Sequence, residues 1–292
     1  MIRKLVSAMT LVGAFAWASP AAAGNIYLTG HDVLLHSGQN DYDNLILDYL
    51  RGAGTSEAIA AGSYDILLLR GFSGSVGAVG VNTLEGFGTI TTRDIADFAG
   101  AGGGAALTAA MTGNEVIVIP SHTSCGGCDV STADADILEA RAAEIAAFFN
   151  AGGDIYGNSG ASDTTYYNFL PPSAAASGAP IGGSSGFQAT AAGVAIGIQN
   201  NMINGFPTHN RFTSFDDDFT VFEIRPQTAG PNEVISIGLR GGRIVEDDIV
   251  VDDTTTDDGT TDDTTVPEPT LLALFGIGMA GAAAARRRRR AN

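Results

Sequence analysis

The sequence predicts an α/β domain built on a doubly wound, mostly parallel sheet. Strand and helix patterns alternate between residues 25 and 157, and this alternation favours parallel strands joined by helical crossovers. Two strand patterns, 64–69 (YDILLL) and 115–120 (EVIVIP), are continuous apolar runs, as is typical of strands buried on both faces. We therefore expect helices on both faces of the sheet.

The first half of the predicted domain begins with a strand at 25–29. A helix is expected at 43–50, because its apolar residues recur at helical spacing and Gly52 ends the pattern. The segment 92–111 is helical in pattern as well, but it contains three consecutive glycines at 102–104. Glycine weakens a helix interior, so this prediction includes a break.

The clearest helical pattern of the chain is 132–153, which has acidic residues in its first turns and a Gly-Gly end. A short strand follows at 154–157. The segment 171–186 is rich in Pro, Ala, Ser and Gly and is expected to be a loop. Two late strands at 219–224 and 233–238 flank a turn-like segment, which predicts a hairpin at one edge of the sheet.

Residues 1–23 have the organisation of a secretory signal peptide. Arg3 and Lys4 form the basic start, an apolar stretch covers 5–17, and Ala21-Ala22-Ala23 is a small-residue cleavage site. The alternative is an uncleaved N-terminal anchor, but the apolar stretch is short for a membrane span. The sequence therefore predicts export through the secretion machinery, across the inner membrane.

The exported part is strongly acidic. Without the two chain ends it has eight arginines, no lysine and 31 acidic residues, a formal charge of −23. Such a surface repels phosphate groups, so no nucleic acid partner is expected. Residues 24–243 form a segment long enough for one domain with a sizeable core.

An acidic Asp/Thr linker is predicted at 244–265. Pairs of aspartates recur every five residues, starting at Asp247, Asp252, Asp257 and Asp262. The segment has few apolar residues and repels itself, which predicts an extended, solvated spacer. Calcium binding is the alternative, but the spacing differs from the calcium-loop pattern of alternating acidic ligands with a distal Glu.

The last segment, 266–292, has three parts in order. Pro267, Glu268 and Pro269 come first, an apolar run follows within a predicted transmembrane segment at 270–285, and five arginines close the chain: Arg286, Arg287, Arg288, Arg289 and Arg290. The run from Leu271 to Ala285 is shorter than the roughly 20 residues that span a bilayer comfortably. The arginines are expected to hold this end in the cytoplasm.

This three-part tail closely resembles the PEP-CTERM sorting signal of Gram-negative bacteria that make exopolysaccharide. The resemblance implies that an exosortase-type sorting enzyme recognises and processes the tail. It implies transient membrane anchoring, followed by release or attachment at the cell surface. The alternative is an ordinary tail anchor, although such an anchor needs no Pro-Glu-Pro before its span.

Cys125 and Cys128 are the two cysteines of the chain, and in an exported protein a local disulfide between them is expected. Their spacing also matches thiol–disulfide oxidoreductases, without the Trp or Pro flanks of thioredoxin-like sites. A metal site with His122 and Asp129, or a nucleophilic cysteine, are further alternatives. A closed zinc site takes four well-placed N and S ligands, and we predict neither a metal nor another cofactor.

Ser159 stands in a Gly-Asn-Ser-Gly-Ala turn directly after the strand at 154–157, which is the shape of a nucleophile elbow. The segment 115–170 resembles the class I glutamine amidotransferase-like superfamily in EVIVIP, in FFNAGGDIYG and in the turn before YYNFLP. The resemblance implies a flavodoxin-like sheet. Ser159 takes the place of the family's cysteine, and Ala161 that of its last glycine. The alternative is an ordinary polar turn.

His209 could supply the catalytic base of such a site. The family commonly has Glu two residues after this histidine, but this chain has Arg211, so the orienting carboxylate is missing. Asp216, Asp217 or Asp218 could substitute for it. His31 and His122 lie in loops that follow predicted strands, so they are expected to line a ligand site with Ser159 and His209 at the carboxyl edge of the sheet.

Three functions remain open from the sequence. The first is an exported, non-catalytic envelope or matrix protein on an amidotransferase-like domain. The second is a secreted hydrolase with Ser159 as nucleophile and His209 as base, which requires the two side chains to be within hydrogen-bond reach. The third is a module that binds exopolysaccharide through the sheet edge and aromatic residues such as Tyr166 and Tyr167.

Overall fold

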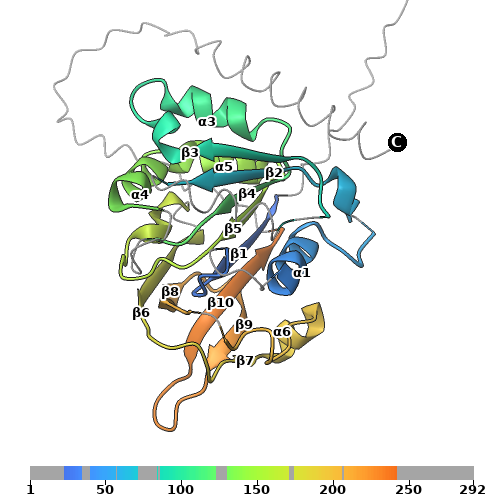
Figure 1. The fold of residues 1–292 in the computed structure, drawn as a ribbon, viewed down its shortest axis with the longest axis vertical. Helices are drawn as coiled ribbons and strands as arrows, with labels where there is room; N and C mark the ends of the chain where they lie inside the picture. Colours follow the sequence, from blue (N-terminus) through green and yellow to red (C-terminus); the bar gives the residue numbers. More distant parts are fainter. Residues whose placement is uncertain are drawn as a thin grey trace, which may run out of the picture.

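A computed structural model describes residues 23–34, 40–56, 58–71, 84, 86–122, 130–170, 174–205 and 207–241. In these ranges the chain forms one mixed sheet with helices packed on it (Figure 1), so the predicted α/β class is confirmed. The predicted linker, the tail with its segment 270–285, Cys125, Cys128 and the signal peptide up to residue 22 lie outside the described residues. None of the helices in the described part of the chain is long and apolar enough to cross a membrane.

The first half of the sheet is parallel, as predicted. Its strands occur in the order β3 (Ile90–Asp94), β2 (Ile66–Arg70), β4 (Val116–Ile119), β5 (Asp154–Gly157) and β1 (Asn25–Thr29). Each neighbouring pair in this series is parallel. β2, β4, β5 and β1 consist largely of buried residues, which agrees with their apolar sequences.

The second half of the sheet is antiparallel, which makes the sheet mixed. β10 (Glu233–Arg240) pairs with β1, followed outward by β8 (Asn210–Phe215) and β6 (Ala176–Pro180). β9 (Thr220–Arg225) forms the predicted hairpin with β10 and also pairs with the short β7 (Gln188–Ala189). The expected place of this hairpin at one edge was wrong, because β10 lies in the middle of the sheet. Five consecutive buried residues in β10 fit this central position.

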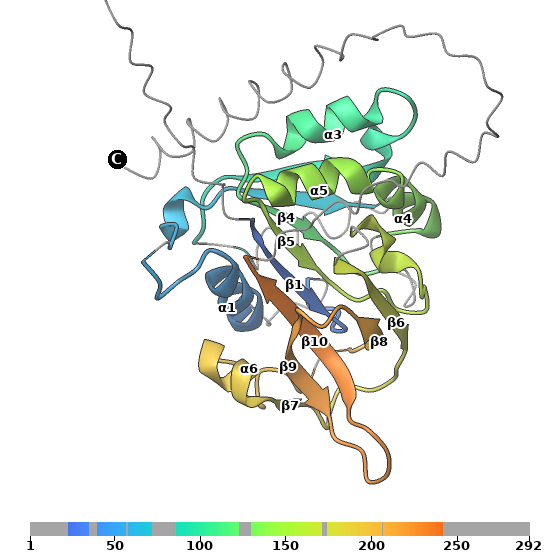
Figure 2. The same cartoon turned by 180° about the vertical axis from the view of Figure 1, so that it is seen from behind.

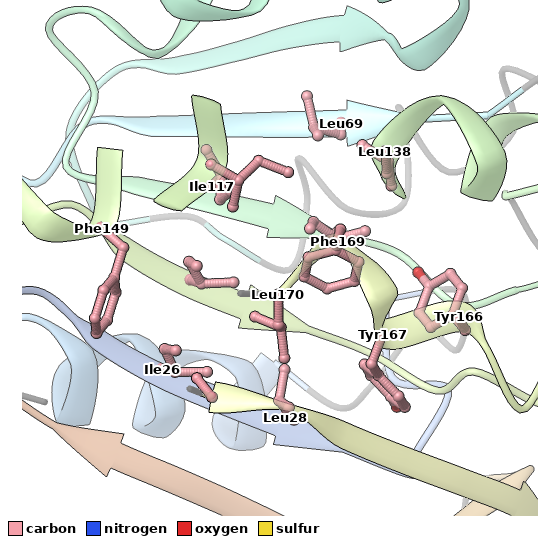
Figure 3. Packing of buried hydrophobic residues seen from close by; sticks show 14 of the residues in the cluster. Ile26, Leu28, Leu69, Ile117, Leu138, Phe149, Tyr166, Tyr167, Phe169 and Leu170 are labelled. Atoms are coloured by element: carbon pink, nitrogen blue, oxygen red, sulfur yellow. The ribbon is translucent and has the colours of Figure 1, made fainter. Parts of the chain in front are cut away.

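Helices cover the two faces of the sheet, as Figures 1 and 2 show from opposite sides. α1 (Asn40–Leu50) and α6 (Ala191–Ile196) pack on one face. α3 (Gly103–Met111), α4 (Thr132–Glu139) and α5 (Ala142–Asn150) pack on the other. Alternate residues of β1 serve both layers, since Ile26 and Leu28 point to one core and Tyr27 to the other. Figure 3 shows the first of these cores, in which Leu28 and Ile117 of the sheet lie near Phe149, Phe169 and Leu170.

The single helix expected over 132–153 is two helices, α4 and α5. The break falls at Arg141, whose Nε donates to the carbonyl oxygen of Phe98 at 2.9 Å and whose Nη2 donates to that of Gly100. A tertiary contact therefore fixes the chain at this point, and helical pattern alone does not reveal it. The start of α4 agrees with the prediction, because Ser131 and Asp134 form a capping box there.

Two other segments differ from their predictions. The region 92–111 is not one helix: it contains most of β3, a 3₁₀ turn at Ile95–Phe98 and then α3. Its glycines lie at the start of α3, where a Cβ on Gly103 would come within 1.7 Å of the Phe98 carbonyl oxygen. The region 171–186 contains β6, whose small residues give no strand pattern.

Gly30 is the point where the end of β1 crosses the start of β8. Its N–H donates to the carbonyl of Ile235 at 2.7 Å, and its own carbonyl accepts from the N–H of His209 at 2.9 Å. A Cβ at Gly30 would lie 1.9 Å from the backbone oxygen of Asn210. No side chain can be added here unless the two strands separate.

We predict that Gly30→Ala lowers the free energy of unfolding by about 3 kcal/mol, because the clash is with backbone atoms that have little room to move. Gly62→Ala is the matched control, since nothing lies within 4 Å of a Cβ at that position. It should change stability by less than about 1 kcal/mol. Urea unfolding of the exported protein measures both variants. Equal losses of unfolding free energy in the two variants would contradict the close backbone contact at Gly30.

Candidate functional site

The carboxyl ends of β1, β4 and β5 meet the start of β8 at one edge of the sheet. Backbone hydrogen bonds join the predicted site residues there: the N–H of His122 donates to the carbonyl of Ser159 at 2.8 Å, and the N–H of Ser159 donates to that of His31 at 3.2 Å. His209 is linked to the same edge through Gly30. The structure thus brings the backbones of these four residues together.

The side chains of Ser159 and His209 have different partners. The Ser159 hydroxyl is fully buried and donates to Oδ1 of Asn210 at 2.7 Å, while the N–H of Ala161 donates to Ser159 Oγ at 3.1 Å. His209 instead lies with Nε2 3.3 Å from Oδ2 of Asp32. Consecutive residues of an extended chain point to opposite sides, so Asn210 faces Ser159 and its neighbour His209 does not. An amide oxygen is no base for the hydroxyl proton.

The turn after β5 is held by Asn210 and Tyr167. The N–H of Gly160 donates to Asn210 Oδ1 at 2.8 Å, and the Tyr167 hydroxyl donates to the carbonyl of Asn158 at 2.9 Å. Ala161 adopts φ of 52°, a left-handed conformation that is uncommon for residues other than glycine. Glycine would adopt this conformation without the steric cost of a Cβ, so alanine is accommodated at Ala161 at some cost.

Tyr166 and Tyr167 are only 1% exposed and belong to the core shown in Figure 3. Burial raises the pKa of the Tyr167 hydroxyl well above its usual value, although its hydrogen bonds with Gly160 and Asn210 oppose the shift. A sugar stacks on an aromatic face that is open to solvent. These two rings, proposed from the sequence as aromatic contacts for polysaccharide, are therefore not available for it.

His122 is 5% exposed and packs against Tyr166. Its Nε2 lies 3.3 Å from Thr132 Oγ1 and 3.6 Å from Asp163 Oδ2, while Nδ1 has no hydrogen-bond partner among the described residues. Burial lowers the pKa of His122, and the nearby Asp163 carboxylate only partly opposes this shift. The described ranges contain no group of three or more His, Cys, Asp or Glu side chains arranged to hold a metal.

His31 does not line an open site but forms part of a buried network around Glu223. Its Nε2 lies 2.7 Å from Glu223 Oε2, and its Nδ1 lies 2.7 Å from the Thr208 hydroxyl. The other carboxylate oxygen of Glu223 accepts from the hydroxyls of Tyr27 at 2.9 Å and Tyr42 at 2.6 Å. The side chains of His31 and Glu223 are completely buried.

Two irregularities of the β9–β10 register place Glu223 in the interior. The pairing shifts on each side of Ser236, the residue opposite Glu223, and such bulges re-aim side chains. Burial and the adjacent Glu223 carboxylate raise the pKa of both Tyr27 and Tyr42 well above their usual value. Both hydroxyls therefore keep their protons and can donate to Glu223.

The sequence interpretation missed four residues of this edge: Asp32, Thr208, Asn210 and Glu223. Asp32 is the carboxylate beside His209, which was sought instead in the aspartates at 216–218. The one available signal was Glu223, a charged residue within the apolar strand pattern FTVFEI. Asn210 gave no signal, because its role depends on a strand crossing 50 residues away in sequence from Gly160.

Comparison with known proteins identifies the end of the chain. Residues 265–290 match the PEP-CTERM protein-sorting motif, so the resemblance noted for the tail is confirmed. No curated protein and no solved structure matches the chain. The motif implies an exported protein that exosortase recognises and processes at the membrane before the protein reaches the surface.

We predict that Tyr42→Phe lowers the free energy of unfolding by about 2 kcal/mol, because the buried Glu223 carboxylate loses a donor at 2.6 Å. Tyr49→Phe is the control: Tyr49 belongs to the same core cluster, but the partner of its hydroxyl is the Arg240 side chain instead of Glu223. Chemical denaturation measures both losses. If Tyr49→Phe costs as much as Tyr42→Phe, the carboxylate network does not carry the stability assigned to it.

A second prediction concerns pH. Because the pKa of His122 is lowered in the folded protein, the unfolded chain binds more protons between the two pKa values. Stability is then complete above the usual histidine pKa of about 6.5 and falls as the pH drops below it. In His122→Gln the slope of unfolding free energy against pH should be smaller there, by up to about 1.4 kcal/mol per pH unit. An unchanged slope would contradict the prediction.

Proposed function

We propose that this chain is an exported envelope or extracellular-matrix protein whose folded domain is a non-catalytic body delivered by the PEP-CTERM tail. The matched motif at 265–290 supports sorting by exosortase. The domain order proposed from the sequence fits this route: a signal peptide at 1–23, an α/β domain at 24–243, an acidic spacer at 244–265 and the sorting tail at 266–292.

The observation that favours a non-catalytic body is the state of Ser159. Its hydroxyl is 0% exposed and donates to an amide oxygen that also accepts the N–H of Gly160. A nucleophile needs both access to substrate and a base that takes its proton. The hydroxyl of Ser159, the amide oxygen of Asn210 and the N–H groups of Gly160 and Ala161 are hydrogen-bonded to one another. This arrangement fits a serine that stabilises the turn.

One observation favours the hydrolase alternative. His209 is paired with the buried Asp32, which resembles the base and orienting carboxylate of a triad. For this pair to act, Ser159 would have to leave Asn210 and reach His209. The alternative therefore requires covalent labelling of Ser159 by a fluorophosphonate probe, and an unlabelled Ser159 in the exported protein would exclude it.

The third proposed function is binding of exopolysaccharide. The two aromatic residues proposed to contact the sugar, Tyr166 and Tyr167, are buried and cannot do so. Attachment to a matrix can still follow from delivery alone. In the proposed sequence of events, the signal peptide directs export, the tail holds the protein at the membrane, and exosortase removes or transfers it. The disulfide proposed between Cys125 and Cys128 would form after export, in an oxidising compartment.

We predict that the exported protein is found without its tail. Mass spectrometry of fractionated cells should show a chain that has lost the arginine-rich terminus, at the surface or in the medium. In cells that lack exosortase, the full-length chain should stay in the membrane fraction, because the apolar run and the arginines still hold it there.

A chain that ends at residue 265 is the control for export. It should leave the membrane in both strains, since it needs no processing. A full-length chain that remains intact in the membrane of cells with exosortase would overturn the proposed route. The same outcome in the control would instead locate the membrane attachment in the folded domain.

A further inference from the structure

A surface cavity lies at the edge of the sheet opposite the predicted site. It has a volume of ≈ 330 Å³ and is lined by Asp48, Tyr49, Ala53, Ala195, Ile196 and Arg240. These residues come from the end of α1 and the turn after it, from α6, and from the last residue of β10. Figures 1 and 2 both show α1, α6 and the end of β10 beside one another.

Arg240 presents its positive charge to this cavity. Its guanidinium lies 4.2 Å from the ring centre of Tyr49, and Nη2 donates to the Tyr49 carbonyl at 3.2 Å. No carboxylate of the described residues forms an ion pair with it. The other charges nearby are Asp48, which is paired with Arg51 at 2.6 Å, and the buried Asp154, whose carboxylate acts on the Tyr49 hydroxyl. The cavity thus presents an arginine without an ion-pair partner among the described residues, in a segment, 24–243, that has eight arginines against 22 acidic residues.

The wall beside Arg240 is apolar. Ala53, Ala195 and Ile196 form it, and Val194, next to Ala195 on α6, is 63% exposed. Aliphatic side chains can pack on the apolar wall formed by Ala53, Ala195 and Ile196. The cavity therefore offers an arginine for a carboxylate and, adjacent to it, an apolar surface for aliphatic side chains.

The chain itself contains a segment of matching chemistry. Residues 246–253 read EDDIVVDD, in which acidic residues flank Ile249, Val250 and Val251. The segment begins six residues after Arg240, and six extended residues span about 20 Å, so it reaches a cavity that Arg240 itself lines. A tether this short keeps the segment at a high effective concentration, on the order of millimolar.

We propose that the linker segment 246–253 docks in this cavity, with its first carboxylates at Arg240 and its aliphatic residues on the wall formed by Ala195 and Ile196. The proposal does not depend on processing of the tail. Docking would leave 254–265 as the free spacer between the folded domain and Pro267. It would also give Arg240 a carboxylate partner, which none of the described residues provides as an ion pair.

Hydrogen–deuterium exchange of the exported protein tests this, with mass spectrometry used first to confirm that residues 246–263 are retained. Amides of 249–253 should exchange at least about tenfold more slowly than the intrinsic rate of an unstructured chain of the same sequence, whereas amides of 257–262, which are remote from the cavity, should exchange at their own intrinsic rate. The protection should weaken in high salt, because the ion pair is partly exposed. Equal protection, relative to the intrinsic rates, in the two segments of the wild-type protein would overturn the proposal.

Two variants identify the contacts. Arg240→Gln and the double variant Asp247→Asn/Asp248→Asn should each abolish most of the protection, whereas Asp262→Asn/Asp263→Asn, with the same change of charge in the same linker, should leave it intact. Protection that survives both of the first two variants would exclude the arginine–carboxylate contact.

Amides of β10 and β1 report folding in the same measurement. If Arg240→Gln speeds their exchange, this variant has disturbed the fold. The Asp247→Asn/Asp248→Asn variant, which changes no residue of the folded domain, then tests the docking contact. Protection that rises with protein concentration would mean that the segment binds a second copy, and the intramolecular proposal would be wrong.

Discussion

The buried carboxylate of Glu223 is the constraint that joins the two halves of the sheet. A carboxylate removed from water is costly unless donors surround it, and this one has Tyr27 and Tyr42 on one oxygen and His31 on the other. Tyr27 and His31 belong to β1 and the residues after it, Tyr42 belongs to α1, and Glu223 comes from β9. These contacts tie the antiparallel hairpin to the parallel half. A shift of the hairpin register by one residue would leave the carboxylate without its donors.

This join has a consequence for the carboxyl edge of the sheet. In a doubly wound parallel sheet, that edge opens into a crevice where ligands bind. Here β10 lies next to β1, which brings β8 across the end of β1 at Gly30 and places Asn210 over the turn after β5. The position that a nucleophile elbow would expose is thereby covered from within the same domain. The antiparallel strands β10 and β8 therefore close off the turn that contains Ser159.

The sequence reveals those parts of this fold that depend on local pattern. β1 and β5 were predicted at their observed bounds, because apolar residues buried on both faces leave a clear signal. β6 and β8 left none, since β6 consists of small residues, β8 has Phe212 and Phe215 among polar residues, and β6 pairs with a strand that is distant in sequence. The same reason explains the site. Ser159 and His209 were correctly placed at one edge, but which way each side chain points was decided by the crossing at Gly30, a close contact of two backbones.

The distribution of charge connects the folded domain with its route of export. The basic residues outside the domain are confined to the two ends, Arg3 and Lys4 at one and Arg286 to Arg290 at the other. While the tail is present, its arginines and apolar run favour the membrane. On the proposed route, which removes both the signal peptide and the tail, residues 24–265 would have a formal charge of −23 and no basic terminus, and anionic headgroups would repel them. On this route, loss of the tail would remove the apolar run and the five arginines that favour the membrane, and would leave only the acidic residues that the membrane surface repels, without any change in the folded domain.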